Sequence, residues 1–261
     1  MDLVGKVAVV TGAGGGGQGR TVALRLAREG AVVVVSDIDE AGGRETLRRI
    51  EKAGGRGAFL RADVGMEDDV RALLAFAEEM FGGLDILVNN AGPYFPGGRL
   101  DRWEETIRAN LMGSVHGTLH AIEPMRRRGG GAIVYYGSTS GVGHGRKHSP
   151  SPAYDVAKAA VARLATTLGW LHQDCGIRVN CVVPDWVATE EVQNYVDSLT
   201  PDERRAGGVP DVLIPLDEIA GGVLRLITDE TLFGRVLIWW NGEPPRLIAQ
   251  GDPGYAALEP F

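Results

Sequence analysis

Short apolar runs alternate along the chain with longer segments whose apolar residues recur at helical spacing. The runs Lys6–Val10 and Ala31–Val35 are rich in β-branched residues, and each ends at a turn of glycine or polar residues. Such runs are typical of buried strands. By contrast, Glu67–Phe81 places its apolar side chains on one face and begins with three acidic residues, which indicates an amphipathic helix. The hydrophobic period therefore switches repeatedly between that of a strand and that of a helix.

The same pattern continues along the chain and predicts an α/β fold. Strands are expected at residues 6–10, 31–35, 57–61, 84–88, 132–136, 177–183 and 235–240. Helices are expected at residues 20–29, 40–53, 67–81, 103–127, 153–174 and 217–228. Alternation at these lengths predicts a parallel sheet covered by helices on both faces. Because no proline- or serine-rich linker and no internal repeat divides the chain, we expect a single domain over residues 1–261.

Two segments stand outside this alternation. Residues 189–210 carry apolar side chains at Val192, Tyr195, Val196 and Leu199, a pattern that fits either a mobile lid over a substrate or an ordinary surface helix. Residues 243–261 follow the last predicted strand and are expected to form a C-terminal tail.

Composition and charge narrow the classes of protein that the chain can represent. Its 261 residues are 44% hydrophobic and 23% charged, which suits one large folded domain. The net charge of −7 argues against a nucleic-acid or anionic-membrane partner. No apolar stretch approaches the ~20 residues of a membrane span, and the N-terminus makes a poor signal peptide. Two cysteines are too few for a disulfide scaffold, so we expect a cytoplasmic protein.

A glycine-rich turn, Thr11–Gly19, joins the first predicted strand to the first predicted helix. Glycine lets the backbone approach a pyrophosphate, and the start of the helix supplies unpaired N–H donors. A flexible turn would explain the glycines equally well, but the position between strand and helix favours a dinucleotide site. We expect Gly12, Gly17, Gln18 and Gly19 to contact the cofactor.

Asp37 ends the second predicted strand, 18 residues after Gly19. A carboxylate there accepts hydrogen bonds from both hydroxyls of the adenosine ribose and repels a 2′-phosphate. Ile38 follows it, and residues 13–18 contain no arginine or lysine to neutralise that phosphate. The sequence therefore favours NAD(H) over NADP(H), the alternative being that Asp37 merely caps the next turn.

Tyr154 and Lys158 lie four residues apart on a predicted helix, so their side chains share one face. An ammonium group beside a tyrosine stabilises the phenolate and lowers the phenol pKa from its ordinary value of about 10. Such a pair suits proton transfer, although the spacing alone is common by chance.

Several further motifs occur in a recognisable order, and with them the chain resembles the classical short-chain dehydrogenase/reductase (SDR) family. They are the glycine turn, Asn89-Asn90-Ala91-Gly92, Asn110, Ser138 in Ser138-Thr139-Ser140-Gly141, Tyr154-Asp155-Val156-Ala157-Lys158, and Pro184-Asp185-Trp186-Val187-Ala188-Thr189. The resemblance runs from about Gly5 to Gly242, nearly the whole chain.

The resemblance implies a doubly wound, Rossmann-like sheet of seven strands and a Ser–Tyr–Lys site supported by Asn. Tyr154 would exchange a proton with the substrate oxygen, and Lys158 would bind the nicotinamide ribose and depress the tyrosine pKa. Ser138 would hydrogen-bond the substrate oxygen, and Asn110 would hold a water that links Lys158 to solvent. The expected reaction is hydride transfer between NAD(H) and a secondary alcohol or ketone.

The resemblance also implies the remaining cofactor contacts and an assembly. Asp63 and Val64 would meet the adenine, and Asn90, Ala91 and Gly92 would line the ribose. Pro184, Val187 and Thr189 would contact the nicotinamide and phosphates. A homo-oligomer, tetramer or dimer, would form through the helices at 103–127 and 153–174 and the C-terminal strand.

Three departures from the family pattern bear on this interpretation. The glycine turn is one residue longer than the usual Thr-Gly-x-x-x-Gly-x-Gly, and Asp185 replaces the glycine of a Pro-Gly pair. Tyr154 also follows Ser138 by sixteen positions, so Gly145–Pro150 is expected to bulge at the substrate entrance. None of these changes removes a proposed catalytic group.

Other interpretations remain open on sequence grounds. The pair His116 and His120 has metal-ligand spacing, but without an evident third ligand it reads better as a helix face, and no metal is expected. Residues expected to shape the substrate pocket are Tyr94, Phe95, Asp185 and Trp186. Alternative functions are an NADPH-dependent ketoreductase such as a 3-oxoacyl reductase, a non-catalytic cofactor-binding protein, and a lyase or epimerase that uses NAD transiently.

Overall fold

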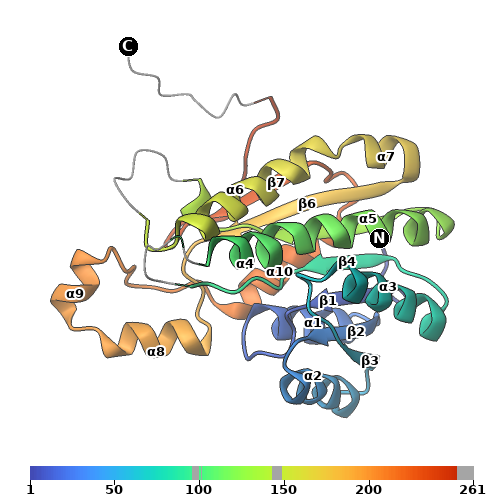
Figure 1. Ribbon diagram of the computed structural model, residues 1–261, viewed down its shortest axis with the longest axis horizontal. Helices are drawn as coiled ribbons and strands as arrows, with labels where there is room; N and C mark the ends of the chain where they lie inside the picture. The colour runs from blue at the N-terminus through green and yellow to red at the C-terminus, as the bar shows by residue number, and fades with distance from the viewer. Residues whose placement is uncertain (96–99, 101, 143–148, 252–261) are drawn as a thin grey trace.

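An eight-stranded sheet forms the centre of the computed structural model, which describes residues 1–95, 100, 102–142 and 149–251 (Figure 1). The strand order is β3-β2-β1-β4-β5-β6-β7-β8. The bounds are β1 Val7–Thr11, β2 Val32–Asp37, β3 Arg56–Arg61, β4 Ile86–Asn89, β5 Gly131–Tyr136, β6 Ile177–Pro184, β7 Arg235–Trp239 and β8 Arg246–Leu247. Strands β1 to β7 pair in parallel, as the sequence predicts, and β8 pairs antiparallel with β7.

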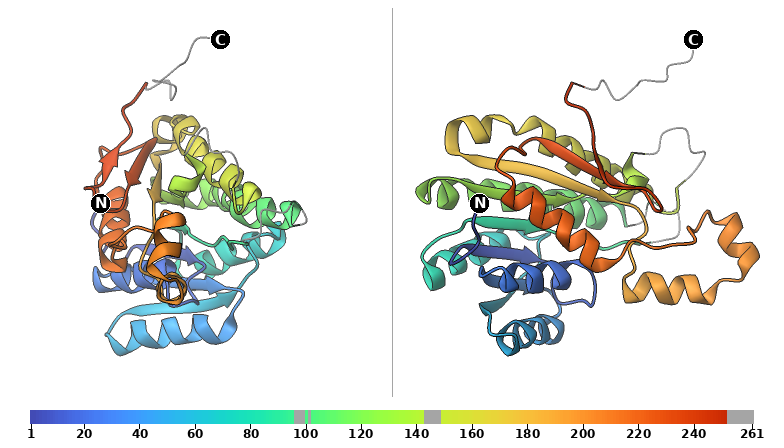
Figure 2. Two further views of the ribbon diagram at one scale, coloured as in Figure 1. Left: turned by 90° about the vertical axis from the view of Figure 1, so that its left-hand side faces the viewer. Right: turned by 180° about the vertical axis from the view of Figure 1, so that it is seen from behind.

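Helices cover both faces of the sheet. Figure 1 shows α3 (Glu67–Phe81), α5 (Gly113–Arg127) and α6 (Pro152–Thr167) on one face. The view from behind in Figure 2 shows α1 (Gln18–Arg28), α2 (Glu40–Lys52) and α10 (Leu216–Thr228) on the other. Strands β1, β5 and β6 are buried throughout, because each face of the sheet packs against a layer of helices and forms its own apolar cluster.

Two of the predicted helices are interrupted. The helix expected at 103–127 divides into α4 (Trp103–Ile107), a π-helical turn η1 (Arg108–Met112) and α5. The helix expected at 153–174 ends at Thr167, and a separate α7 (Trp170–Cys175) follows Gly169. Glycine is a poor helix former, which is consistent with the second break.

The C-terminal third contains elements outside the regular alternation of strands and helices. Within the predicted lid lie α8 (Glu190–Ser198) and α9 (Pro201–Ala206), which project from one end of the sheet (Figure 1). Thr200 and Glu203 form a reciprocal capping box at the start of α9. All seven predicted strands are present, and the start of the segment expected to be a tail adds the two-residue strand β8; residues 252–261 lie outside the described residues. Over the described residues, no helix has the length and apolar character of a membrane span.

The parallel strands bring several predicted site residues to one edge of the sheet. The glycine turn follows β1, Asp37 ends β2, Asn90 follows β4, and Ser138 lies just beyond β5. The strand order reverses between β1 and β4, and in open α/β sheets ligands bind at the carboxyl ends of the strands beside such a reversal.

Candidate active site

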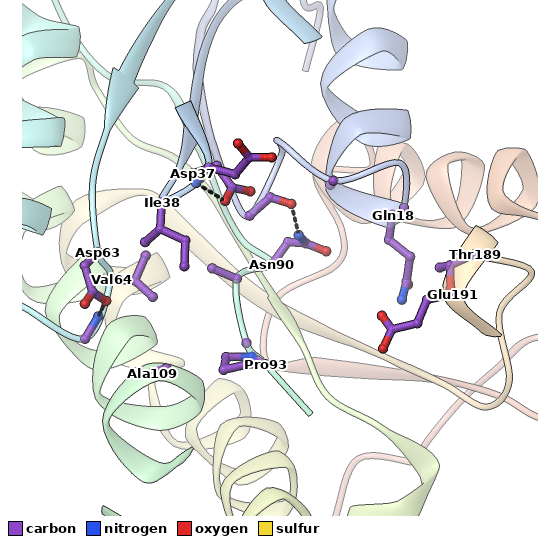
Figure 3. Close-up of a pocket in the computed structure, with 18 of the residues that line it drawn as sticks. Gln18, Asp37, Ile38, Asp63, Val64, Asn90, Pro93, Ala109, Thr189 and Glu191 are labelled. Atoms are coloured by element: carbon purple, nitrogen blue, oxygen red, sulfur yellow. Dashed lines mark hydrogen bonds between the residues drawn. The ribbon is translucent and has the colours of Figure 1, made fainter. Parts of the chain in front are cut away.

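A cleft of about 940 Å³ lies at this edge of the sheet. Eleven of the residues predicted to bind the cofactor line it: Gly12, Gly17, Gln18, Gly19, Asp37, Asp63, Val64, Asn90, Ala91, Gly92 and Thr189. Figure 3 shows Asp37, Asp63 and Val64 towards one end of the cleft and Gln18 and Thr189 towards the other. The cleft is therefore elongated and bordered by segments from across the strand reversal.

The glycine turn leaves the start of α1 open to a ligand. Gly17 caps the helix without a side-chain hydrogen bond, so the first N–H groups of α1 have no side-chain acceptor from the cap. A Cβ atom at Gly19 would overlap the carbonyl of Gly12, so α1 can pack this closely only with glycine there. The Asn90 amide donates to the carbonyls of Thr11 (3.0 Å) and Gly12 (2.9 Å) and fixes the turn. This cradle fits the pyrophosphate of a dinucleotide.

Asp37 presents its carboxylate at the opposite end of the cleft. Its Oδ2 atom accepts a hydrogen bond from the Gly14 N–H (2.7 Å), and its Oδ1 atom accepts one from the Asp39 N–H (3.0 Å). Asp63 is oriented similarly, because its Oδ1 atom accepts a hydrogen bond from the Gly65 N–H (2.9 Å). Each carboxylate oxygen has more than one lone pair, so both groups keep acceptor capacity towards the cleft.

Lys158 is buried beside the carboxyl end of β5. Its Nζ atom donates a hydrogen bond to the carbonyl oxygen of Tyr136 (2.9 Å) and lies 5.2 Å from the centroid of the Tyr154 ring. Burial lowers the pKa of Lys158 to about 8, because a low-dielectric surrounding disfavours the ammonium form.

Asn110 lies in the π-helical turn and reaches the same space. Its Nδ2 atom donates to the carbonyls of Pro93 (3.0 Å) and Thr106 (3.1 Å), while its buried Oδ1 atom has no hydrogen-bond partner among the described residues. A Cβ atom at Gly92 would overlap Asn110 Oδ1 and lie 3.1 Å from Lys158 Nζ. The unpaired oxygen, the amino group and Gly92 therefore border one small space. π-Helical turns often occur at functional sites.

Tyr154 and Ser138 meet above the end of β5. The Ser138 hydroxyl lies near enough to the Tyr154 phenol to lower its pKa, and it accepts a hydrogen bond from the Ser140 hydroxyl (3.0 Å). Burial raises the pKa of Tyr154 to about 12, and the Ser138 hydroxyl opposes this shift. The protein surroundings thus favour the neutral phenol in this arrangement, which is the form that can donate a proton.

Aromatic side chains and one carboxylate surround these groups. The Tyr94 ring packs edge-on against Tyr154, with centroids 5.1 Å apart, and Trp186 stacks on Tyr195 of α8 at 6.0 Å. Asp185 accepts a hydrogen bond from Thr139, the neighbour of Ser138, at 2.8 Å. Phe95, also predicted to shape the pocket, lies under the Arg102 guanidinium. Most of the predicted bulge at 145–150 lies outside the described residues.

Four of the residues predicted to bind the cofactor do not line the cleft: Tyr154 and Lys158, which lie beside it, and Pro184 and Val187. Pro184 is buried at the end of β6, and Val187 is buried and bridges to Ile214. The cleft instead includes Glu190, Glu191 and Asn194 of α8, which sequence reasoning missed. Figure 3 shows Gln18 and Glu191 pointing towards one another across the cleft. The acidic pair after Thr189 is a helix-start signal, but the pattern does not say which surface that helix faces.

His116 and His120 face a carboxylate rather than one another. Glu67, at the start of α3, lies 3.7 Å from His116 Nε2 and 3.0 Å from His120 Nε2. Over the described part of the chain, no group of three or more histidine, cysteine or acidic residues has an arrangement that could hold a metal ion.

Comparison with known proteins assigns the chain to a family. The short chain dehydrogenase family profile matches residues 6–199. A cis-4-hydroxycyclohexanecarboxylate dehydrogenase of Sinomonas cyclohexanicum is 40% identical over 87% of this chain and 91% of its own length. A 3beta-hydroxysteroid dehydrogenase of Eggerthella lenta is 35% identical over 89% of this chain and 90% of its own length.

A solved structure agrees with this assignment. The hydroxysteroid dehydrogenase from Escherichia coli superposes with a TM-score of 0.79 and 28% identity, covering 92% of this chain and 97% of that one. The chain belongs to the short-chain dehydrogenase/reductase family and is an oxidoreductase of that family. Members use a nicotinamide cofactor, NAD or NADP, and the glycine cradle and elongated cleft fit such a dinucleotide.

Proposed function

We propose that this protein transfers a hydride between NAD(H) and a secondary alcohol or ketone. The observation that carries the proposal is the convergence of Tyr154, Ser138, Lys158 and Asn110 beside the cleft. A bound nicotinamide supplies or accepts the hydride, so the protein has to orient the substrate oxygen and move one proton.

Each of the four side chains has a role in that proton transfer. Tyr154 donates the phenol proton to the carbonyl oxygen during reduction and recovers it during alcohol oxidation. Ser138, which lies beside the phenol, holds the substrate oxygen in line with it. Lys158 binds the nicotinamide ribose and stabilises the phenolate that forms during the cycle. The unpaired Oδ1 atom of Asn110 supports a proton path from the Lys158 amino group.

The cleft suggests how the cofactor lies. The pyrophosphate would meet the start of α1, and the adenosine half would extend to Asp37, Asp63 and Val64. The Asp37 carboxylate would accept hydrogen bonds from both ribose hydroxyls and repel a 2′-phosphate. This arrangement supports NAD(H) over NADP(H). The nicotinamide end would then lie towards Lys158 and Tyr154.

The aromatic surroundings support a ring-bearing substrate. Tyr94 contacts Tyr154 on one side, and the stacked pair Trp186 and Tyr195 provides flat apolar surface near the lid. Aromatic side chains pack well on flat rings in offset or edge-on arrangements. The names of two relatives refer to a cyclohexane ring and a steroid, which agrees with this choice. We therefore propose a secondary alcohol on an alicyclic or fused ring.

A substrate panel tests the proposal. Cyclohexanol, decalol and a 3-hydroxysteroid should reduce NAD faster than acyclic secondary alcohols of equal carbon number, measured by reduced-nicotinamide absorbance. Tyr154→Phe should lower the rate by roughly 10²–10⁴-fold while leaving NADH binding nearly intact, because the ring stays and only the proton donor is lost. More than about a tenth of the wild-type rate in a pure variant would contradict the role of Tyr154.

The same panel separates the alternatives. Turnover of ketones with NADPH alone would favour a ketoreductase, such as one acting on 3-oxoacyl groups. Conversion of substrate without accumulation of NADH would favour a lyase or epimerase. Tight cofactor binding with no turnover of any alcohol or ketone would favour a non-catalytic cofactor-binding protein.

A further inference from the structure

Arg20, in the first turn of α1, ties the glycine turn to helix α2. Its Nη2 atom donates hydrogen bonds to the carbonyl oxygens of Gly14 and of Gly42 in α2, the second at 3.2 Å. Its Nε atom donates to the hydroxyl of Thr46, also in α2, at 2.8 Å. Residues 13–18 contain no arginine or lysine, but Arg20 folds back against them through its bond to Gly14.

Thr46 continues this contact into the turn. Its side chain is fully buried, and its hydroxyl donates to the carbonyl oxygen of Ala13 at 2.6 Å. The peptide bond between Ala13 and Gly14 therefore has its carbonyl held on the α2 side. In a planar trans peptide the N–H points away from the carbonyl. The Gly14 N–H accordingly points in the opposite direction, where it donates to Asp37 Oδ2 at 2.7 Å.

These contacts form one continuous chain of hydrogen bonds. The guanidinium of Arg20 donates to Thr46, Thr46 donates to the Ala13 carbonyl, and the same peptide donates through Gly14 to Asp37. Linked hydrogen bonds in a partly buried setting polarise and orient one another. Arg20 also holds the next peptide through the Gly14 carbonyl, so both peptides that flank Gly14 are fixed.

We propose that Arg20 and Thr46 are positioning residues that orient Asp37 through the Ala13–Gly14 peptide and so set the affinity for the adenosine ribose of NAD(H). This inference rests on the proposed role of Asp37 in binding the ribose. It also assigns a function to the lengthened glycine turn, which presents a backbone N–H to the carboxylate. Arg20 itself is engaged by α2 and the turn and is not a partner for a 2′-phosphate.

Equilibrium binding tests the proposal without any need to know the substrate. Dissociation constants for NADH, NADPH, 5′-AMP and nicotinamide mononucleotide are measured on wild type, Arg20→Lys, Thr46→Val and Thr46→Ser. Arg28→Lys, at the exposed end of the same helix, is the matched control. Thermal unfolding of each variant identifies any that fails to fold, and the two sites give independent variants.

Arg20→Lys and Thr46→Val should each raise the dissociation constants of NADH and 5′-AMP about tenfold. This is the loss expected when a hydrogen bond to a charged group, here the Asp37 carboxylate, is disrupted. Nicotinamide mononucleotide should bind equally to every variant, because the contacts concern only the adenosine half. Thr46→Ser keeps the hydroxyl and should bind NADH and 5′-AMP as tightly as wild type does. In an Asp37→Asn background the Arg20→Lys effect should shrink, because both substitutions act on one interaction.

Several outcomes would overturn the inference. One is unchanged 5′-AMP affinity in both folded variants, and another is an equal loss for nicotinamide mononucleotide, which would indicate a general structural effect. Fully additive losses with Asp37→Asn would remove the link to Asp37. A selective loss of NADPH affinity in Arg20→Lys would instead make Arg20 a phosphate ligand. A failure of the proposed function can be told apart from these outcomes, because it would be seen in wild type itself, as a preference for NADPH or as an absence of turnover.

Discussion

The amino group of Lys158 donates a 2.9 Å hydrogen bond to the carbonyl oxygen of Tyr136, the last residue of β5. The lysine is therefore oriented by the backbone of the sheet and not by the phenol of Tyr154. This anchoring lets a long, flexible side chain hold its charge at a fixed place, 5.2 Å from the tyrosine ring centroid. It also keeps the amino group in a buried site, where the charged form is disfavoured.

Burial of Lys158 predicts a particular dependence of stability on pH. Its pKa is lowered from 10.5 to about 8, so between these values the unfolded chain binds a proton that the folded chain does not. The contribution of this group to the free energy of unfolding therefore rises with pH across that window. Relative to Lys158→Met, wild type should gain up to about 3 kcal/mol from pH 8 to 10.5, measured by urea unfolding.

The two proteins are compared by how steeply the free energy of unfolding changes with pH. This comparison removes stability losses that do not depend on pH, such as the loss of the Lys158 hydrogen bond to Tyr136. Lys52→Met, at the exposed end of α2, serves as the control and should parallel wild type at every pH. A constant difference between wild type and Lys158→Met throughout the window would mean that the amino group is not desolvated as the structure indicates.

Local rules explain why much of the fold could be predicted. The strand and helix runs carry their own periods, and the pair Tyr154 and Lys158 shares a helix face because of its spacing alone. The parallel order then brings the carboxyl ends of the strands to one edge, which explains why Asp37 and Asn90 line one cleft. The fold and the cleft lining thus follow from short-range pattern combined with one topological rule.

Features that depend on tertiary contacts could not be predicted in this way. The π-helical turn at Asn110 accompanies hydrogen bonds to Pro93 and to Thr106, and the first of these partners is far along the chain. The contact of Arg20 with Thr46 likewise joins two helices whose crossing the sequence does not specify. Strand β8 has only two residues and depends on pairing with β7, so its pattern is too short to be distinctive.

Asp185 should restrict the substrate by charge. Asp185 occupies the position where the family usually has glycine, and its carboxylate accepts a hydrogen bond from Thr139, the neighbour of Ser138. A substrate that brings its own carboxylate near this point meets like charge in a partly desolvated site. Asp185→Asn should raise kcat/KM for 4-hydroxycyclohexanecarboxylate about tenfold relative to cyclohexanol, equivalent to about 1.4 kcal/mol. Asp68→Asn, an exposed change on α3, should leave the ratio unaltered.

If the ratio also stays fixed in Asp185→Asn, the carboxylate does not face the substrate. Thr139→Val provides a second measurement, because it frees the Asp185 side chain without removing its charge. That variant should keep the discrimination against the anionic substrate, whereas Asp185→Asn should lose it.

The exposed apolar side chains on one face predict a homo-oligomer. Leu119 of α5 is 57% exposed and Val156 of α6 is 49% exposed, on the helix layer that faces the viewer in Figure 1. Exposed apolar side chains on helices of one layer are candidates for a subunit interface. Light scattering should give two or four times the mass of the chain, and Leu119→Asp with Val156→Glu should lower it. A monomer across the micromolar range for wild type would contradict the prediction.

Cofactor choice should depend on the Asp37 carboxylate. It ends β2, lines the cleft and is held by the N–H groups of Gly14 and Asp39, so it is fixed where the adenosine ribose is expected. Charge-assisted hydrogen bonds to the two ribose hydroxyls would each contribute roughly 1.5–3 kcal/mol. A 2′-phosphate would instead meet like charge. Wild type should therefore have the higher kcat/KM with NADH than with NADPH.

Asp37→Ser combined with Ile38→Arg should shift the preference towards NADPH. Ile38 is 60% exposed beside the cleft, so an arginine there can reach a 2′-phosphate and bind it through two N–H groups. Ile38→Arg alone is the control that separates the effect of an added cation from that of a lost carboxylate. It should raise kcat/KM with NADPH but leave the value with NADH higher. Comparison of kcat/KM for both cofactors decides the matter. A double variant that keeps the wild-type preference would mean that the adenosine ribose does not bind at the end of β2.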